Sequence, residues 1–140
     1  MVRANKRVDY TYRGFSPSED AEQEALFEWA ELMMGKYPEL CMMAHVANEG
    51  KRTQSYGAKL KRMGMKKGFP DITLPVPRGS YHGLYIELKA ANGTPSDDQL
   101  WWLDRLTEQG YKAQLAYGAG EAIEIVTRIW RARNENQADT

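Results

Sequence analysis

The stretch Gly83-Leu84-Tyr85-Ile86-Glu87-Leu88-Lys89-Ala90 predicts a β-strand. Successive side chains of a strand point to opposite faces, so Glu87 and Lys89 lie on one face together with Tyr85. The leucines, the isoleucine and the alanine take the other face, which is expected to pack in the core. The strand therefore carries an acid and an amine side by side.

A second acid precedes this strand in the sequence. Gly68-Phe69-Pro70-Asp71 leads into a predicted strand over residues 70–77, and residues 78–83 predict a turn. In a hairpin the beginning of one strand meets the end of its partner. Asp71 is therefore expected to lie near Glu87.

Two carboxylates and a lysine in this arrangement suit the hydrolysis of a phosphodiester. Asp71 and Glu87 can hold a hard cation by oxygen ligation, and such a cation activates water and acts as a Lewis acid. Lys89 can position the water and stabilise developing negative charge. The alternative is that Glu87 and Lys89 form the solvated face of an ordinary amphipathic strand, which is the commoner meaning of an isolated Glu-x-Lys pattern.

These stretches, followed by Ser96 through Gln99 and Trp102-Leu103, resemble the VRR-NUC family of the PD-(D/E)XK nuclease superfamily. Residues 19–23 and 45–50 also resemble segments of its stand-alone, phage-type members. The resemblance covers about residues 19–125. It implies an α/β fold with a restriction-endonuclease-like core, in which a mixed central sheet is flanked by helices.

The resemblance implies a metal-dependent DNA endonuclease that acts as a homodimer on branched DNA such as Holliday junctions. Mg²⁺ is the expected ion and Mn²⁺ its substitute, because an all-oxygen site suits both. The Leu88 carbonyl is a candidate third ligand beside Asp71 and Glu87. The expected catalytic residues are Asp71, Glu87, Lys89, Glu19 and Gln99.

Two helix residues of this set leave alternatives open. Glu19 either reaches the edge of the metal site or closes a capping box that begins at Ser16, and Glu22 is a rival for the metal site. Gln99 lies on the helix face of Leu103, where a polar amide needs a partner. The resemblance makes Gln99 a supporting or phosphate-contacting residue near the lysine, and the alternative is a surface glutamine.

The net charge of the chain is zero, but the charges are segregated. Residues 18–31 contain six acids and no base, whereas residues 50–70 contain seven bases and no acid. The basic block over residues 50–70 leads into the Pro-Asp turn, which would place its positive charge where a phosphate backbone must lie. The alternative is that these residues form an ordinary basic helix exposed to solvent. The expected DNA-binding residues are Lys51, Arg52, Lys59, Lys61, Arg62, Lys66, Lys67 and His45. For His45 the alternative is a purely structural role.

The length of 140 residues suits one domain. We expect a basic arm over residues 1–15, a nuclease domain over residues 16–132 and a polar tail over residues 133–140. The chain shows neither a membrane-spanning apolar run nor a secretory signal, and Cys41 is expected to be a buried thiol. These features predict a cytoplasmic protein, and the resemblance implies that it could be phage-encoded and act in a bacterial host.

The expected order of elements is α-β-β-β-α-β-α, with a short basic helix in the first crossing. Helices are predicted over residues 16–35, 56–63, 94–108 and 120–132, and strands over residues 40–46, 70–77, 83–90 and 111–117. Trp101 and Trp102 are expected to pack rather than to stack on bases.

Two other functions remain open on the sequence alone. The chain could be a non-catalytic DNA-binding subunit on a nuclease fold, although such a subunit has no need of Asp71, Glu87 and Lys89 together. It could also be a nuclease of other specificity, such as an exonuclease or an RNA-directed enzyme.

Overall fold

A mixed sheet of four strands, in the order β1-β2-β3-β4, organises the protein. The computed structural model describes residues 18–47 and 53–131, so the expected N-terminal arm, Lys51, Arg52 and the C-terminal tail lie outside the described residues. β2 pairs antiparallel with β1 and with β3, and β3 pairs parallel with β4. The strands are β1 (Ala44–His45), β2 (Ile72–Leu74), β3 (Leu84–Lys89) and β4 (Lys112–Tyr117).

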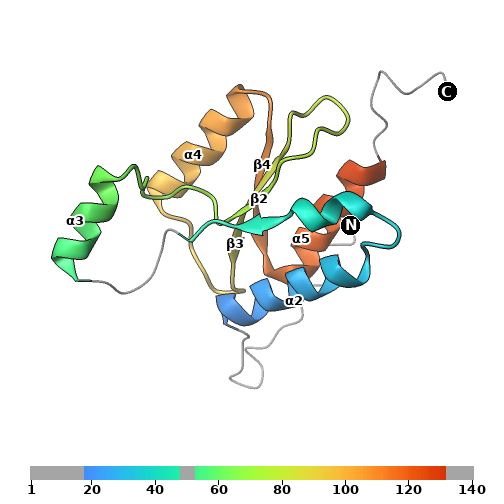
Figure 1. The fold of residues 1–140 in the computed structure, drawn as a ribbon, viewed down its shortest axis with the longest axis horizontal. Coiled ribbons are helices and arrows are strands. Elements are labelled where there is room, and N and C mark those ends of the chain that lie inside the picture. Colours follow the sequence, from blue (N-terminus) through green and yellow to red (C-terminus); the bar gives the residue numbers. More distant parts are fainter. Residues whose placement is uncertain (1–17, 48–52, 132–140) are drawn as a thin grey trace.

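Helices cover both faces of this sheet (Figure 1). They are α2 (Glu19–Leu32), α3 (Gln54–Arg62), α4 (Asp97–Glu108), α5 (Gly118–Arg131) and the 3₁₀ helix η2 (Pro38–Met42). α2 and α5 pack against each other and against β3, while α4 packs on β4 from the opposite face. α3 projects to one side of the body (Figure 1) and none of its residues is buried. The expected mixed sheet flanked by helices is confirmed.

The alternation of β3 separates an apolar face from a polar one. Leu84, Ile86 and Leu88 are fully buried in the core that α2 and α5 share with the sheet. Burial of one such side chain is worth about 1.5–3 kcal/mol, which fixes the register of the strand, since a shift by one residue would turn Glu87 into this core. Glu87 and Lys89 consequently face α4, and they are buried there as well.

The N-cap residues of α2 and α4 lie two residues later in the sequence than the expected helix starts at residues 16 and 94. α2 begins after Ser18, whose hydroxyl accepts a hydrogen bond from Ala21 N–H at 3.1 Å. α4 begins after Ser96, and a capping box joins Ser96 to Gln99. The prediction that Glu19 closes a capping box from Ser16 was therefore wrong, because Glu19 is the first residue of its helix.

The segment expected to form a strand over residues 40–46 was also predicted incorrectly. Pro38 starts η2 at Pro38–Met42, and only Ala44 and His45 then pair with β2. The tight turn of η2 buries Leu40 and leaves Cys41 exposed, so the expectation of a buried thiol was wrong. An apolar run without strict alternation could not distinguish this turn from a strand.

Candidate active site

Three carboxylates from distant parts of the sequence meet at one end of the sheet. Glu19, Asp71 and Glu87 each place one carboxylate oxygen within 4.8 Å of the other two. Asp71 is 6% exposed, Glu87 is fully buried and Glu19 is partly buried. Like charges this close repel one another in a poorly solvated site, and a bound cation would relieve this repulsion.

The hairpin of β2 and β3 brings Asp71 and Glu87 together, as the sequence predicted. Ile72 pairs with Ile86, so the preceding residue, Asp71, lies beside Glu87. Asp71 Oδ1 accepts a hydrogen bond from the Leu88 backbone N–H at 3.0 Å. One side of the cluster is thus held by the backbone of β3.

The backbone of Asp71 is held from β1. Its carbonyl accepts a hydrogen bond from Val46 N–H at 2.7 Å and lies 2.9 Å from His45 Nδ1. If His45 carries its proton on Nδ1, both groups donate to the same oxygen. The structure therefore brings His45 to the main chain beside the carboxylates, where it can orient Asp71.

Glu87 is oriented by two side chains that carry donors. Gln99 Nε2 donates to Glu87 Oε2 at 3.1 Å, and Lys89 Nζ lies 3.8 Å from the same oxygen. Gln99 Oε1 meanwhile accepts a hydrogen bond from Ser96 N–H at 2.8 Å. A flipped amide would oppose donor to donor and acceptor to acceptor, so the amide orientation follows from its two partners. Gln99 is buried and has the partner that its position required.

Lys89 is enclosed rather than solvated. It is 9% exposed, and a lysine is seldom buried so deeply unless it is paired. A Cβ atom at Gly93 would lie 3.2 Å from Lys89 Cβ and Cδ, so the glycine leaves room for the lysine stem. The ammonium group at the end of this stem lies next to the Glu87 carboxylate.

Glu22, the rival of Glu19, serves another part of the fold. Its Oε1 accepts a hydrogen bond from Ala119 N–H at 3.2 Å. Ala119 lies in the first turn of α5, where unpaired N–H groups and the helix dipole favour a negative charge. Glu22 therefore ties α2 to α5, and among the described residues Glu19 is the member of α2 that joins the carboxylate cluster.

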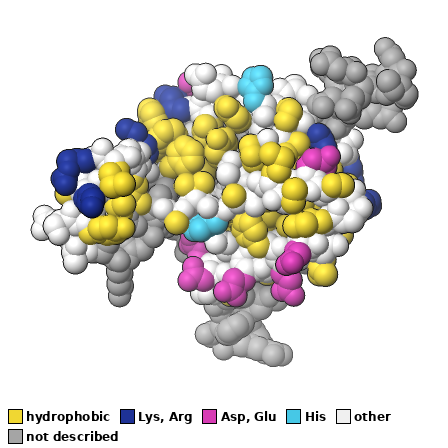
Figure 2. Space-filling view, in the orientation of Figure 1, with side chains coloured by type: hydrophobic (Ala, Val, Ile, Leu, Met, Phe, Trp, Pro, Cys, Tyr) yellow, Lys and Arg dark blue, Asp and Glu magenta, His cyan; other side chains and the backbone are white. Residues whose placement is uncertain are grey.

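The described members of the basic block over residues 50–70 fall into two groups. Lys59, Lys61 and Arg62 are exposed on the projecting helix α3, and Figure 2 shows basic side chains over this helix and acidic ones along α2. Lys66 and Lys67 are also exposed and lie just before the Gly68 turn that leads to Asp71. These two lysines continue the positive charge toward the site.

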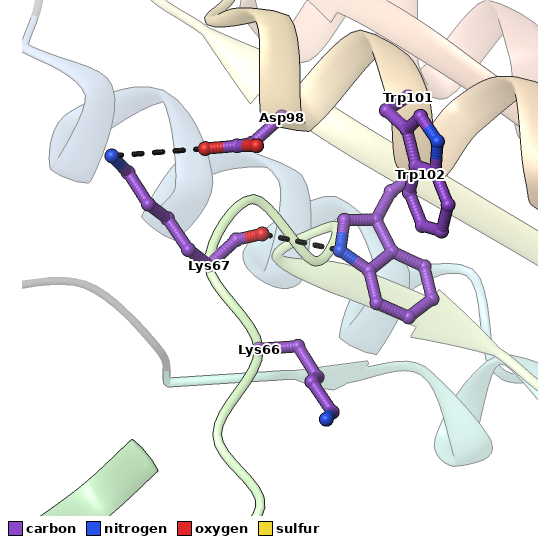
Figure 3. A pocket seen from close by; sticks show the side chains of 5 residues that line it. All are labelled: Lys66, Lys67, Asp98, Trp101 and Trp102. Atoms are coloured by element: carbon purple, nitrogen blue, oxygen red, sulfur yellow. Dashed lines mark hydrogen bonds and ion pairs between the residues drawn. The ribbon is translucent and has the colours of Figure 1, made fainter.

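The sequence interpretation missed an open pocket beside α4. It has a volume of about 570 Å³ and is lined by Lys66, Lys67, Asp98, Trp101 and Trp102 (Figure 3). Trp102 packs as expected, because its Nε1 donates to the Lys67 carbonyl at 3.1 Å, but Trp101 is 52% exposed. With 3.6 residues per turn, Trp101 lies opposite the buried helix face of Gln99 and Leu103, so periodicity could have identified its exposure.

Comparisons with known proteins agree with this fold. The sequence model of the VRR-NUC domain matches residues 18–120. A solved structure described as "VRR_NUC domain protein" is 29% identical in sequence, with a TM-score of 0.73 over 84% of this chain and 92% of that one. No curated protein matches the chain. None of the described helices is long and apolar enough to cross a membrane.

Proposed function

This chain belongs to the VRR-NUC family, and we propose that it is a metal-dependent DNA endonuclease whose cation is held by Glu19, Asp71 and Glu87. Membership of the family implies a nuclease-type function in DNA processing. The observation that carries the assignment to this site is the approach of three carboxylate oxygens to within 4.8 Å of one another.

The donor set suits a hard divalent ion. The group consists of carboxylates alone, which favour Mg²⁺ or Mn²⁺ over metals that prefer nitrogen or sulfur ligands. In our proposal the Leu88 carbonyl is a further ligand. A bound ion would supply Lewis acidity and would activate water for attack on the phosphodiester.

The remaining side chains orient the reactants and stabilise charge. Lys89 Nζ can donate hydrogen bonds to the attacking water or to a phosphate oxygen, and its burial strengthens that interaction. Gln99 holds Glu87 Oε2 in place through a hydrogen bond of 3.1 Å. Because Gln99 is itself held by Ser96, the Glu87 carboxylate has little freedom to turn away.

In this proposal DNA approaches over the exposed basic residues of α3 and over Lys66 and Lys67, whose positive charge attracts a phosphate backbone. In this proposal the substrate is branched DNA of the Holliday-junction kind, and two copies of the chain pair so that two sites cut two strands. The resemblance to stand-alone members of the family supports both points. Light scattering at micromolar concentration would give the oligomeric state, and a monomer under all conditions would remove the paired-cut scheme.

Cleavage assays test the reaction directly. A labelled four-way junction, linear duplex, single-stranded DNA and RNA would be incubated with Mg²⁺, Mn²⁺ or EDTA. We expect metal-dependent cutting of the junction that Lys89→Ala abolishes. Lys112→Ala is the matched control, because Lys112 pairs with Leu84 at the opposite end of β3.

The outcomes of these assays distinguish the candidate functions. Equal cutting of every DNA would keep the endonuclease and exclude a junction preference. Cutting of RNA alone would show that the substrate class is RNA rather than DNA. DNA binding without any cutting would favour a non-catalytic subunit, and full activity of Lys89→Ala would exclude the proposed site.

Metal binding can be measured without turnover. Calorimetric titration with Mn²⁺ should show a lower affinity for Glu19→Gln than for the wild type. Glu22→Gln should bind Mn²⁺ normally, because its amide oxygen can still accept the hydrogen bond from Ala119. Equal affinities for Glu19→Gln and Glu22→Gln would remove Glu19 from the metal site.

A further inference from the structure

The pocket beside α4 has the chemical character of a nucleotide subsite. Trp101 exposes 52% of its surface at the rim of a cavity of about 570 Å³. The same cavity is lined by Lys66, Lys67 and Asp98. Exposed indole, cations and a hydrogen-bond acceptor are thus gathered at one place on the surface.

Each component matches one part of a nucleotide. An indole provides a surface on which any base can stack, and lysines neutralise a backbone phosphate. A carboxylate can accept a hydrogen bond from an exocyclic base amine. Lys67 Nζ and Asp98 Oδ2 lie 3.6 Å apart, but their side chains are 79% and 53% exposed, so this weak pair can exchange for contacts with a ligand.

The pocket is built on a fixed frame. The Trp102 indole donates to the Lys67 carbonyl, as Figure 3 shows, and packs edge-on against Phe69 with 4.9 Å between ring centroids. A Cβ atom at Gly68 would lie 2.6 Å from the Asp98 carbonyl carbon. The loop that carries both lysines is therefore pressed directly onto the first turn of α4, which limits the ordering required when a ligand binds.

The pocket shares its supports with the carboxylate cluster. Lys67 precedes Asp71 by four residues, so their Cα atoms are at most about 14 Å apart. Asp98 directly precedes Gln99, which contacts Glu87. At an axial rise of about 3.4 Å per nucleotide of one strand, a separation of this size spans at most about four nucleotide steps.

From this geometry, and resting on the proposed function, we infer that the pocket binds one unpaired nucleotide within about four nucleotides of the scissile phosphate. Its base stacks on Trp101, and its phosphate is neutralised by a lysine of the pocket wall, Lys66 or Lys67. The substrate class is therefore branched DNA in which a nucleotide next to the cut is unpaired, or becomes unpaired when the protein binds. A fully paired duplex would leave the indole without a base.

A binding cycle tests the stacking contact independently of catalysis. Fluorescence anisotropy in EDTA would compare a labelled duplex with a single-stranded extension and the same DNA with an abasic site at each position in turn. Trp101→Ala should weaken binding of the intact DNA roughly 5- to 150-fold, the range that corresponds to about 1–3 kcal/mol per stacked base. An abasic site at one position should weaken wild-type binding by a similar factor and should weaken Trp101→Ala no further.

Leu100→Ala is the matched control, because Leu100 is 43% exposed on the same helix but does not line the pocket. Trp101→Phe, which keeps an aromatic ring, should retain most of the affinity, and circular dichroism would verify that each variant is folded. Additive losses, or equal affinities for Trp101→Ala and Leu100→Ala, would overturn the inference.

The same experiment separates failure of the inference from failure of the proposed function. If the wild type binds and cuts DNA but the losses are additive, the endonuclease stands and the nucleotide pocket does not. If the wild type neither binds nor cuts any DNA, both are refuted. If Trp101→Ala converts a dimer to a monomer in light scattering, the pocket is an interface between two copies and the inference is also overturned.

Discussion

Replacing Gln99 with glutamate would place a carboxylate directly against Glu87. The two side chains are 5% and 0% exposed, and Gln99 Nε2 lies 3.1 Å from Glu87 Oε2. Two unit charges at this separation repel by about 5 kcal/mol at an effective dielectric constant of ~20. The substitution leaves an oxygen to accept the Ser96 N–H, so the capping box is retained and the added charge is the main change.

Protonation limits the destabilisation. Repulsion from Glu87 raises the pKa of the introduced carboxyl above its usual ~4.3. At pH 7 this carboxyl can avoid the repulsion by binding a proton, which costs about 3.7 kcal/mol of free energy for a group with that usual pKa. The loss in free energy of unfolding at pH 7 is therefore at most about 3.7 kcal/mol. Because the pKa is raised in the folded state, this loss is present above pH ~4.3 and shrinks by about 1.4 kcal/mol per pH unit as the pH falls toward that value.

Urea denaturation in EDTA between pH 5 and pH 8 would measure this dependence, with each variant compared with the wild type at the same pH. Gln99→Ala is the control: it removes the hydrogen bond to Glu87 without adding a charge, so its loss of about 1–3 kcal/mol should vary with pH less than the loss for Gln99→Glu. Added Mg²⁺ should restore part of the stability of Gln99→Glu, since a bound cation offsets both carboxylates. If Gln99→Glu lowers the free energy of unfolding by the same amount at every pH, the side chains of residues 99 and 87 do not contact each other and the reasoning is refuted.

Three further predictions concern the surroundings of the site. Gly68→Ala should lower the free energy of unfolding by about 2–5 kcal/mol in urea denaturation, because φ is 85° and the added Cβ would meet the Asp98 backbone; a loss below about 1 kcal/mol would contradict that contact. Glu22→Ala should cost about 1 kcal/mol of stability while metal affinity is unchanged, since it removes the hydrogen bond to Ala119 N–H; a selective loss of Mn²⁺ binding would return Glu22 to the metal site. Replacing Lys59, Lys61 and Arg62 together with alanine should reduce the slope of the log binding constant against the log salt concentration by about one for each lost phosphate contact. An unchanged slope would mean that α3 faces away from DNA.

The part of the site that the sequence predicted depends on local rules. The alternation of β3 and the turn before it were enough to bring Asp71 beside Glu87, because strand period and hairpin connection act over a few residues. The buried face of α4 likewise identified Gln99 as an amide that needs a partner. In each case the neighbouring residues determine which way the side chain points.

The parts that the sequence did not predict depend on choices between nearly equal local structures or on tertiary contacts. Each Pro-containing helix start offers two hydroxyls as N-caps, and the second is used in both observed helices. At α4, the second choice places Gln99 rather than Asp97 at the third helical position, and the longer side chain completes the capping box. The pocket at Trp101 also requires the Gly68 loop to lie on α4, which nothing in either segment alone specifies.

The positions of these caps explain how the cluster of carboxylates is tolerated in the fold. Starting α2 after Ser18 makes Glu19 its first residue, and starting α4 after Ser96 places Gln99 in the first turn. Both helices thus direct their positive N-terminal ends toward the cluster, and each such end stabilises nearby negative charge by about 0.3–1 kcal/mol. This is small beside the repulsion among three carboxylates, so the helix ends make only a minor contribution to the stability of the cluster. In the proposed metal site a bound divalent cation would offset the negative charge far more strongly than the helix ends do, so we expect removal of either serine cap to weaken the fold more than it weakens metal binding.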